Sequence, residues 1–294
     1  MRIHVLRNPS GGGKTSRRRA AEAVGRLRGA GHEVVELTGD SAAASEDALA
    51  SAVRSGEIER LLLAGGDGLV HLAIQHLAKT SIPVVIAPTG TGNDFATALG
   101  LTDNSSPIEQ TVEAPAQPVD LMLVTSTSGQ RWVASVAIAG FPAAINERAN
   151  AMSLPVGAPI YAIAAVLELP SFARSQMQLS VDGEPLAIDT AMMAIGNTSL
   201  FGGGMLVCPD ATPTDGHLHL TSIESVGRLG VIPHLIGRAG GTDHRPEVTK
   251  RMARQIEIHT PGIAMWGDGE PLTTTPISID LVPAAINIVG ATPT

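Results

Sequence analysis

The chain has 294 residues, of which 44% are hydrophobic and 16% charged, a composition typical of a folded globular protein with room for two domains. Its net charge of −8 and its few aromatic residues argue against general nucleic-acid binding, because phosphate backbones attract basic surfaces and bases stack on aromatic rings. A single cysteine excludes an intrachain disulfide, and no apolar stretch reaches the roughly 18 residues that a membrane-spanning helix needs.

The first hundred residues alternate short apolar runs with amphipathic segments. We predict strands over residues 3–6, 34–37, 61–64 and 83–87, with helices between them, one of which spans residues 42–55. Strands that alternate with helices form parallel sheets, whose strands are buried on both faces. The pattern lapses between residues 102 and 118, so we expect a first α/β domain with a parallel sheet over residues 1–118.

Glycine-rich turns follow three of these strands, at residues 8–14, 65–68 and 90–94. Strands of an open parallel sheet end at the edge where ligands bind, and glycine lets the backbone and the next helix N-terminus approach a phosphate. The turns therefore predict a polyanion site; the alternative is that each glycine serves only a tight turn. The P-loop pattern fails because Asn8 stands where it needs glycine, and the dinucleotide fingerprint lacks its third glycine.

The positive charge of this acidic chain is concentrated near its start. The first 31 residues contain eight Lys and Arg residues against the single acid Glu22. This cluster is either a solvated basic helix face or a device that draws in an anion.

Downstream of residue 118 the pattern changes to strands separated by turn signals. Predicted strands cover residues 120–125, 131–139, 176–181, 187–195, 217–223, 255–259, 263–266 and 277–282, whereas helices are expected only over residues 155–169 and 226–238. Asp182-Gly183 is a strong hairpin signal, and no internal repeat is evident. We predict a mainly antiparallel, sandwich-like β domain over residues 119–283, followed by residues 284–294, whose strand at 286–289 can return to the first domain.

Seven short motifs occur in one order along nearly the whole chain. They are Asn8-Pro9 with residues 10–14, then residues 65–68, 88–96, Val119-Asp120, Gly196-Asn197 with residues 201–205, residues 209–211 with 215–216, and residues 268–270. In this order they resemble the bacterial diacylglycerol kinase-like lipid kinases, which are related to sphingosine kinases and, more distantly, to NAD kinases and phosphofructokinases. The resemblance implies an NAD kinase/phosphofructokinase-like first domain, followed by a lipid-substrate domain.

The resemblance also implies that ATP lies across the carboxyl edge of the first sheet. The implied nucleotide contacts are Asn8, Pro9, Ser10, Gly11, Gly12, Lys14, Thr38, Gly65, Gly66, Asp67, Gly68, Leu69, His71, Thr91 and Asn93. The family usually has Thr at the position of Leu69 and commonly Asn at that of His71, so a hydroxyl contact is lost here. We expect the backbone amides of residues 66–69 to make most of the contacts to the nucleotide here, because any residue supplies an amide.

Phosphoryl transfer needs positioning, amide donors, a metal ion and a base, because its transition state requires little covalent help. By resemblance, Asp67 belongs to the catalytic machinery and acts on the Mg²⁺ that accompanies ATP. The same resemblance makes Glu270 the general base, with Asp268 in the same catalytic turn. Taken alone, Asp268-Gly269 predicts only a hairpin turn.

The loop at residues 212–217 is rich in oxygen ligands, which Mg²⁺ prefers. The family pattern places Mg²⁺ at Asp215 with the carbonyls of Thr212 and His217, and with Asp120 reaching it through water. Taken alone, the Asp-Gly pair in this loop is more often a turn. The nine histidines show no zinc spacing.

We therefore expect an ATP-dependent lipid kinase that transfers the γ-phosphate to a hydroxyl of a diacylglycerol-like lipid and serves phospholipid biosynthesis. The lipid would enter a cleft between the domains, and apolar surfaces at residues 155–169 and 226–236 line its site unless they are ordinary core. The alternatives are a kinase for a soluble alcohol such as NAD, and a nucleotide- or lipid-binding protein without turnover. The expected partners are ATP, Mg²⁺ and a lipid, without nucleic acid. The expected location is cytoplasmic and peripheral to a membrane, and a homodimer is compatible with the sequence.

Overall fold

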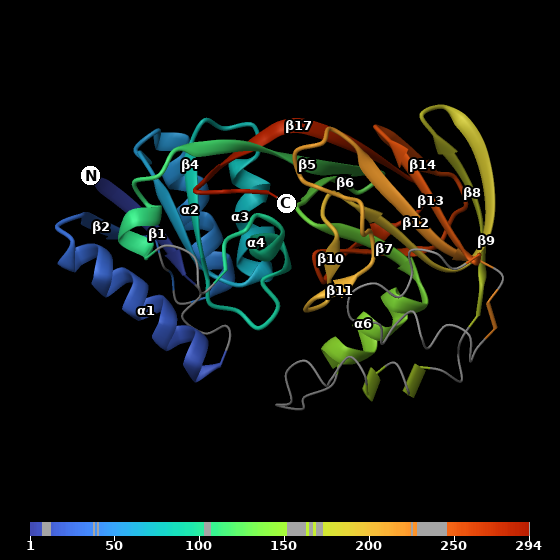
Figure 1. The fold of residues 1–294 in the computed structure, drawn as a ribbon, viewed down its shortest axis with the longest axis horizontal. Coiled ribbons are helices and arrows are strands. Elements are labelled where there is room, and N and C mark those ends of the chain that lie inside the picture. Colours follow the sequence, from blue (N-terminus) through green and yellow to red (C-terminus); the bar gives the residue numbers. More distant parts are fainter. Residues whose placement is uncertain are drawn as a thin grey trace. The chain divides into compact units, whose positions relative to one another are not determined.

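The computed structural model describes the chain except for residues 8–12, 38, 40, 103–106, 152–162, 165–166, 169–172, 225, 228–245 and 294. The chain divides into two compact units: Met1–Leu121 with Pro283–Thr294, and Met122–Val282. It crosses from one unit to the other within two strands, β5 (Ala116–Ser126) and β17 (Ile277–Val289) (Figure 1).

The first unit is built on a parallel sheet, as predicted. Its strand order is β17-β4-β3-β1-β2, from β1 (Arg2–Arg7), β2 (Glu33–Glu36), β3 (Leu61–Gly65), β4 (Pro83–Pro88) and the end of β17. Helices α1 (Lys14–Gly29), α2 (Ala42–Ser55) and α3 (Asp67–Leu77) connect successive strands, and the short helices α4 (Asp94–Ala98) and α5 (Ile108–Thr111) follow β4 (Figure 1). The central strands are nearly continuous buried runs, because both faces of a parallel sheet are covered.

The last strand of the chain completes this sheet. Asn287 and Ile288 of β17 pair in parallel register with Pro83 and Val84 of β4. The sequence predicts two strands here, over residues 277–282 and 286–289, whereas the structure has one strand of 13 residues. The apolar pattern breaks near Ala284, which has a φ of 51°. The strand continues through this bend because the Ala284 N–H donates to the Asp120 carboxylate at 2.8 Å.

The core of the first unit lies between the sheet and its helices. Helix α1 buries Ala20, Val24 and Leu27, which share one face at helical spacing and pack in one cluster with Ile3 and Val5 of β1. Burying a side chain such as Leu27 contributes about 1.5–3 kcal/mol, so this face fixes α1 on the sheet.

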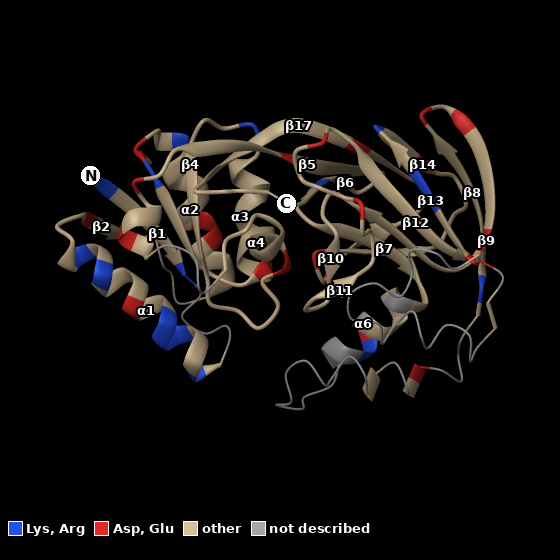
Figure 2. Ribbon diagram, in the orientation of Figure 1, with Lys and Arg blue, Asp and Glu red and all other residues tan. Residues whose placement is uncertain are grey.

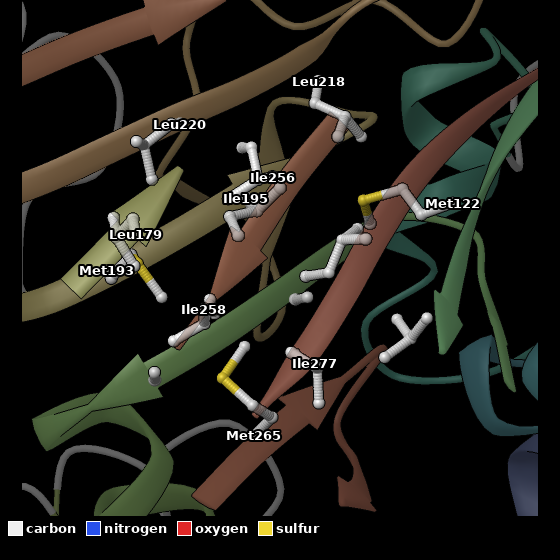
Figure 3. Packing of buried hydrophobic residues seen from close by; sticks show 14 of the residues in the cluster. Met122, Leu179, Met193, Ile195, Leu218, Leu220, Ile256, Ile258, Met265 and Ile277 are labelled. Atoms are coloured by element: carbon white, nitrogen blue, oxygen red, sulfur yellow. The ribbon is translucent and has the colours of Figure 1, made fainter. Parts of the chain in front are cut away.

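The second unit is mainly antiparallel, as predicted. Its strands are β6 (Gly129–Val133), β7 (Val136–Gly140), β8 (Ser175–Val181), β9 (Glu184–Gly196), β12 (Leu218–Glu224), β13 (Val248–Ala253), β14 (Gln255–Ile258), β15 (Ala264–Gly267) and β16 (Glu270–Thr274), with a small pair β10 (Leu200–Phe201) and β11 (Met205–Leu206). Neighbours run in the order β16-β15-β7-β9-β8-β14-β17, and β12 and β13 extend from β9. All these pairings are antiparallel. The core contains Met122, Leu179, Met193, Ile258 and Met265, each from a different strand (Figure 3).

The second unit differs from the predicted elements in several places. The predicted strand over residues 131–139 is interrupted at Ala134–Ser135, which links β6 to β7. Strands β13 and β16 were not predicted. Both lie at sheet edges, and only Ala253 is buried in the two strands together, so their sequences lack an apolar alternation. Helix α6 (Phe141–Ala151) was not predicted either, and most of the predicted helices at 155–169 and 226–238 lies outside the described residues. Within the part of the chain that is described, none of the helices has the length and apolar composition to cross a bilayer.

His4 lies inside the first unit, on β1, with 2% of its surface exposed. Burial lowers the pKa of its imidazole below the usual 6.5, and the charge of Arg2 lowers it further. Below about pH 6.5 the unfolded chain therefore binds a proton that the folded protein does not, so stability falls as the pH drops. We expect the melting temperature to fall between about pH 7 and about pH 5, and to fall less steeply in His4→Leu. Equal slopes for the two proteins in scanning calorimetry would contradict this.

Candidate functional site

The two glycine-rich turns that follow β3 and β4 are in direct contact. A Cβ atom on Gly90 would lie 2.6 Å from the Cα of Gly66, and one on Gly66 would lie 3.0 Å from the Cα of Gly90. The Thr89 N–H donates to the Gly65 carbonyl at 3.0 Å. Lack of space, rather than a left-handed backbone, therefore requires glycine at both positions. The two turns, residues 65–68 and 89–93, form one loop cluster.

Asn93 gives the second turn its shape. Its Oδ1 accepts from the Gly90 N–H at 3.0 Å, and its Nδ2 donates to the Gly90 carbonyl at 2.9 Å. The residue has a φ of 57°, a left-handed conformation that Asn tolerates better than most residues. The Asn93 side chain, predicted to contact ATP, is thus used to fold the turn, whereas Thr91 in the same turn is exposed.

Helices α1 and α3 both begin with glycine in the N-cap position. Gly13 and Gly66 have no side chain to bind the first amides, whereas the Ser41 side chain caps α2. Ser16 in the first turn of α1 lies against the end of β4, with its Oγ 3.2 Å from Thr89 Oγ1. The first amides of a helix have no intrahelical acceptor and carry the positive end of the helix dipole. The starts of α1 and α3 therefore offer an anion-binding surface next to the loop cluster.

Leu69, in the first turn of α3, faces inward. Only 8% of it is exposed, and it lies over Gly65, where an added Cβ would come within 2.5 Å of Leu69 Cδ2. The Leu69 N–H donates to the Gly66 carbonyl at 3.0 Å. This amide, one of those predicted to hold phosphate, is therefore engaged within the helix.

The remaining predicted nucleotide contacts fall into two groups. His71 is half-buried on α3, and its carbonyl accepts from Gln75 Nε2 at 2.9 Å. Thr38 and residues 8–12 (Asn8, Pro9, Ser10, Gly11 and Gly12) lie outside the described residues.

Two carboxylates stand at the starts of α3 and α4. Asp67 Oδ1 accepts from the Phe95 N–H at 3.3 Å, which ties the two helix starts together. Asp94, the first residue of α4, is 7% exposed. Asp94 is not among the predicted site residues, although an acid directly after a glycine-rich turn is the same signal that marks Asp67. Mg²⁺ prefers oxygen ligands, so both carboxylates could hold the cation that accompanies a nucleotide.

Basic side chains run along α1 (Figure 2). Lys14 is its exposed first residue. Near the other end, Arg28 donates to Glu36 at 2.9 Å, and Arg7 donates to the same carboxylate at 2.8 Å. Burial would raise the pKa of Glu36, but the hydrogen bonds from Arg7 and Arg28 outweigh it and hold the pKa below its usual value. Glu36 therefore stays ionised and offsets these two cations, whereas Lys14 lies at the exposed start of the helix.

In the second unit, Glu270 follows a tight hairpin turn directly. Strands β15 and β16 pair with Gly267 opposite Glu270, and the turn residues Asp268 and Gly269 have φ of 54° and 87°. Positive φ at both central residues is the mark of the type I′ turn, which Asp-Gly favours. The hairpin prediction is confirmed. The turn presents Glu270 as an exposed carboxylate at the start of an edge strand.

Asp268 uses both carboxylate oxygens to bind backbone amides. Oδ2 accepts from the Ala134 N–H at 2.8 Å, and Oδ1 accepts from the Ser135 N–H at 2.7 Å. These short, charge-assisted bonds engage the group that the family resemblance placed in the catalytic turn.

The predicted metal ligands belong to different units. Asp215 Oδ2 accepts from His219 Nε2 at 2.8 Å and from Thr212 Oγ1 at 3.2 Å, and Oδ1 accepts from the His217 N–H at 2.8 Å. Asp120 belongs to the first unit, where it supports β17. Among the described residues, no group of three or more His, Cys, Asp or Glu side chains could hold a metal ion.

The Asp215 loop nevertheless has a donor set that suits a hard cation. Oδ1 of Asp215 accepts one bond and so keeps acceptor capacity, and His217 adds a backbone carbonyl in the same loop. The Thr212 carbonyl already accepts from the N–H groups of Thr214 and Asp215 at 2.8 and 3.2 Å. Burial raises the pKa of the nearby Cys208 thiol to about 12, so without a metal this thiol is protonated.

Two family models match the chain. The diacylglycerol kinase catalytic domain matches residues 2–124, and the YegS C-terminal NAD kinase beta sandwich-like domain matches residues 135–290. A diacylglycerol kinase of Mycobacterium tuberculosis is 34% identical over 294 residues, covering 98% of this chain and 94% of the relative. A protein of Xanthomonas euvesicatoria named "probable lipid kinase YegS-like" is 32% identical over 288 residues, covering 91% of this chain and 90% of the relative.

Solved structures share the fold at low sequence identity. The crystal structure of a diacylglycerol kinase from Bacillus anthracis has a TM-score of 0.71 at 16% identity, covering 99% of this chain and 96% of the other. An NAD kinase from Archaeoglobus fulgidus in complex with ATP has a TM-score of 0.52 at 16% identity, covering 100% and 94%. These likenesses confirm the predicted fold class. Together with the family models and the relatives, they confirm the predicted resemblance, and the chain is a kinase that belongs to the bacterial diacylglycerol kinase-like lipid kinases.

Proposed function

We propose that this protein transfers the γ-phosphate of ATP to a hydroxyl of a diacylglycerol-like lipid. The observation that carries the proposal is the contact of Gly66 with Gly90, which brings two strand-to-helix turns together in one loop cluster. Such a cluster directs backbone donors at an anion and excludes side chains from the space that a phosphate would fill. Family membership supports a lipid as the acceptor.

On the nucleotide side, the Gly68 amide and the start of α1 would bind phosphate oxygens, and Lys14 would add positive charge. Asp67 and Asp94 would hold Mg²⁺, which when bound neutralises phosphate charge. The amides are held in place by the packing of the two turns. They therefore need no reorganisation as charge moves during transfer, which is how fixed donors stabilise a transition state.

On the acceptor side, Glu270 would accept the hydroxyl proton as the acceptor oxygen forms its bond to the γ-phosphorus. The bond from the γ-phosphorus to the β–γ bridging oxygen breaks, and ADP leaves with that electron pair. An exposed carboxylate on an edge strand is accessible to an incoming alcohol. A positioned general base of this kind contributes about 10²–10⁴ to the rate.

A diacylglycerol-like acceptor resides in a lipid bilayer, so the reaction requires contact with a membrane surface. We therefore propose a cytoplasmic protein in peripheral contact with a membrane, whose phosphorylated product enters phospholipid biosynthesis. A soluble alcohol such as NAD is the second candidate acceptor, favoured by the fold shared with the ATP-bound NAD kinase. Homodimer formation stays a prediction.

Radiolabelled ATP incubated with the protein and extracted lipids tests the function. Label in the lipid phase, with a product mass one phosphate higher, would support the proposal. Label in an aqueous product would favour a soluble acceptor, and ATP binding without any transfer would favour a protein without turnover. Either of the last two results would overturn the lipid kinase proposal.

We further propose that Mg²⁺ binds Asp215 with the carbonyls of Thr212 and His217, and that Asp120 reaches it through water. A ligand that binds only the folded state at 100 times its Kd adds about 2.7 kcal/mol, so MgCl₂ should raise the melting temperature of EDTA-treated protein by several degrees. Asp215→Asn should abolish this shift, whereas Asp210→Asn, at an exposed acid paired with Lys250, should keep it. An EDTA-treated protein that does not respond to MgCl₂ would contradict the site.

A further inference from the structure

The sequence Asp-Gly-Glu-Pro-Leu occurs twice in the second unit, at residues 182–186 and 268–272. Both copies turn a hairpin in the same way, between β8 and β9 and between β15 and β16. The Asp residues have φ of 49° and 54°, and the Gly residues that follow have φ of 84° and 87°. The expectation of no internal repeat is therefore wrong on this short scale. The first copy is a matched control for the hairpin that carries Glu270.

Asp268 attaches its hairpin to a buried link between two strands. The ladder between β15 and β7 ends with Gly267 opposite Ala137, and the Asp268 N–H adds one more bond, to the Val136 carbonyl at 3.2 Å. The carboxylate then binds the next two amides, those of Ala134 and Ser135, which are 1% and 4% exposed. A side chain thus continues the hydrogen bonding where the backbone ladder stops.

Asn197, at the end of β9, binds the carbonyls of the same link. Its N–H donates to the Ser135 carbonyl at 2.8 Å, and its Nδ2 donates to the Ala134 carbonyl at 2.8 Å. Both amides of Ala134–Ser135 therefore bind Asp268, and both carbonyls bind Asn197, with the Ser135 carbonyl also accepting from the Thr198 N–H at 3.2 Å. A buried amide without an acceptor costs free energy, so breaking the bonds between Asp268 and the Ala134 and Ser135 amides would destabilise the folded protein.

The first copy of the repeat also binds two consecutive amides, but with a single carboxylate oxygen and in an exposed setting. Asp182 Oδ1 accepts from the N–H groups of Arg254 and Gln255 at 2.8 and 2.9 Å. Both of these residues are exposed, so water can replace the carboxylate there. The turn, the sequence and the number of amides bound are matched between the two hairpins. What differs is the burial of the bound residues and the number of carboxylate oxygens used, two in Asp268 and one in Asp182.

We infer that Asp268 is a positioning residue, which fixes the Glu270 hairpin to the buried Ala134–Ser135 link and does not itself react. Glu270 follows two residues later and lies opposite Gly267. A Cβ added to Gly267 would lie 2.7 Å from Leu272 Cδ1 and 2.8 Å from Val133 Cγ2. The base of the hairpin is thus tightly packed, and its tip is tied down by Asp268. This inference rests on the proposed role of Glu270 as the general base.

Hydrogen exchange tests the attachment without any substrate. The Ala134 and Ser135 amides should exchange slowly in the wild-type protein and at least about tenfold faster in Asp268→Asn, because Asn offers one acceptor oxygen and turns an NH₂ toward the other amide. Asp182→Asn should leave the Ala134 and Ser135 amides protected. It should change exchange at Arg254 and Gln255 little, because one oxygen of Asp182 accepts from both amides and Asn keeps an oxygen. Fast exchange at Ala134 and Ser135 in the wild-type protein would overturn the inference even if the variant did not fold.

Kinetics separate positioning from direct catalysis. Because a misplacement of about 1 Å can cost about 10²-fold, Asp268→Asn should lower kcat by about that factor, with the KM for ATP and the Mg²⁺ requirement unchanged. Asp182→Asn should keep kcat within about twofold, as expected for a change away from the reacting groups. A clearly raised Mg²⁺ requirement in Asp268→Asn would make Asp268 a metal ligand and overturn the inference, as would an unchanged kcat.

A double variant tests whether Asp268 acts through Glu270. In a Glu270→Gln background, Asp268→Asn should lower kcat no further, because the group that it positions is already gone. An additional loss of about 10²-fold in that background would show an independent role and overturn the inference. If the wild-type protein phosphorylates no alcohol but the exchange results hold, the kinase proposal fails and the structural attachment stands.

Discussion

Glu270→Gln is expected to lower kcat by about 10²–10⁴, because the amide cannot accept the proton that leaves the acceptor hydroxyl. The substitution keeps the size of the side chain at an exposed position on an edge strand, so folding should be unaffected. ATP affinity should also be unchanged, since we propose that the nucleotide binds at the loop cluster of the first unit. Single-turnover phosphorylation measures the first effect, and calorimetric titration with ATP measures the second.

The matched control for this variant is Glu184→Gln. Glu184 occupies the same position of the same five-residue sequence, is exposed, and follows the same type of turn. We expect its kcat to stay within about twofold of the wild-type value, as for most surface substitutions. Full activity in Glu270→Gln would remove Glu270 from the role of base. Equal losses in the two variants would trace the effect to the hairpins in general and not to a carboxylate at residue 270.

Gly90→Ala is expected to disrupt the loop cluster and with it ATP binding. The new methyl group would lie 2.6 Å from the Cα of Gly66 and 2.8 Å from Asn93 Oδ1, distances that force the two turns apart. Overpacking of this kind costs about 1–3 kcal/mol, and the displaced amides would no longer converge on a phosphate. Urea unfolding measures the loss of stability. Titration with ATP should show affinity reduced by about tenfold or more, which corresponds to about 1.4 kcal/mol.

Two other glycines calibrate this result. Gly66→Ala should have a smaller effect, because its methyl group would meet the Gly90 Cα at 3.0 Å. Gly25→Ala, in the middle of α1 with nothing within 4 Å, should stabilise the protein by about 0.5–1 kcal/mol and leave ATP affinity unchanged. A Gly90→Ala protein that binds ATP as well as Gly25→Ala would show that the contact between the turns is not what holds the nucleotide.

Much of the fold could be predicted from local patterns in the sequence. Buried runs such as residues 61–64 and 83–87 are strands because both faces of a parallel sheet are covered, and the Asp-Gly pairs are type I′ turns because only a few residues accept positive φ at low cost. The glycines of the loop cluster were also visible, since each follows a strand directly. Edge strands β13 and β16 were missed because only Ala253 is buried in the two strands together, so neither sequence has an apolar alternation to detect.

The roles of particular side chains could not be predicted in this way. From the sequence, Leu69 indicates only the loss of a hydroxyl. In the structure its side chain packs against Gly65, and its amide is engaged within α3. Asp268 reads as part of a catalytic turn, but its partners are amides more than 130 residues earlier in the chain. From the sequence, Asp94 is only one residue of a motif. In the structure it is a buried acid next to Phe95, whose N–H donates to Asp67.

The sequence by itself determined the alternation of strands and helices, the glycine turns, the Asp-Gly hairpins and the family, because each of these depends on residues that are neighbours along the chain. Only the tertiary structure decided that Gly66 meets Gly90, that Asp120 supports the bend at Ala284, and that Asp268 binds the break in a predicted strand at Ala134–Ser135. These contacts join residues far apart in the sequence. They depend on which surfaces pack together, and the hydrophobic periodicity of a single segment does not predict its packing partner.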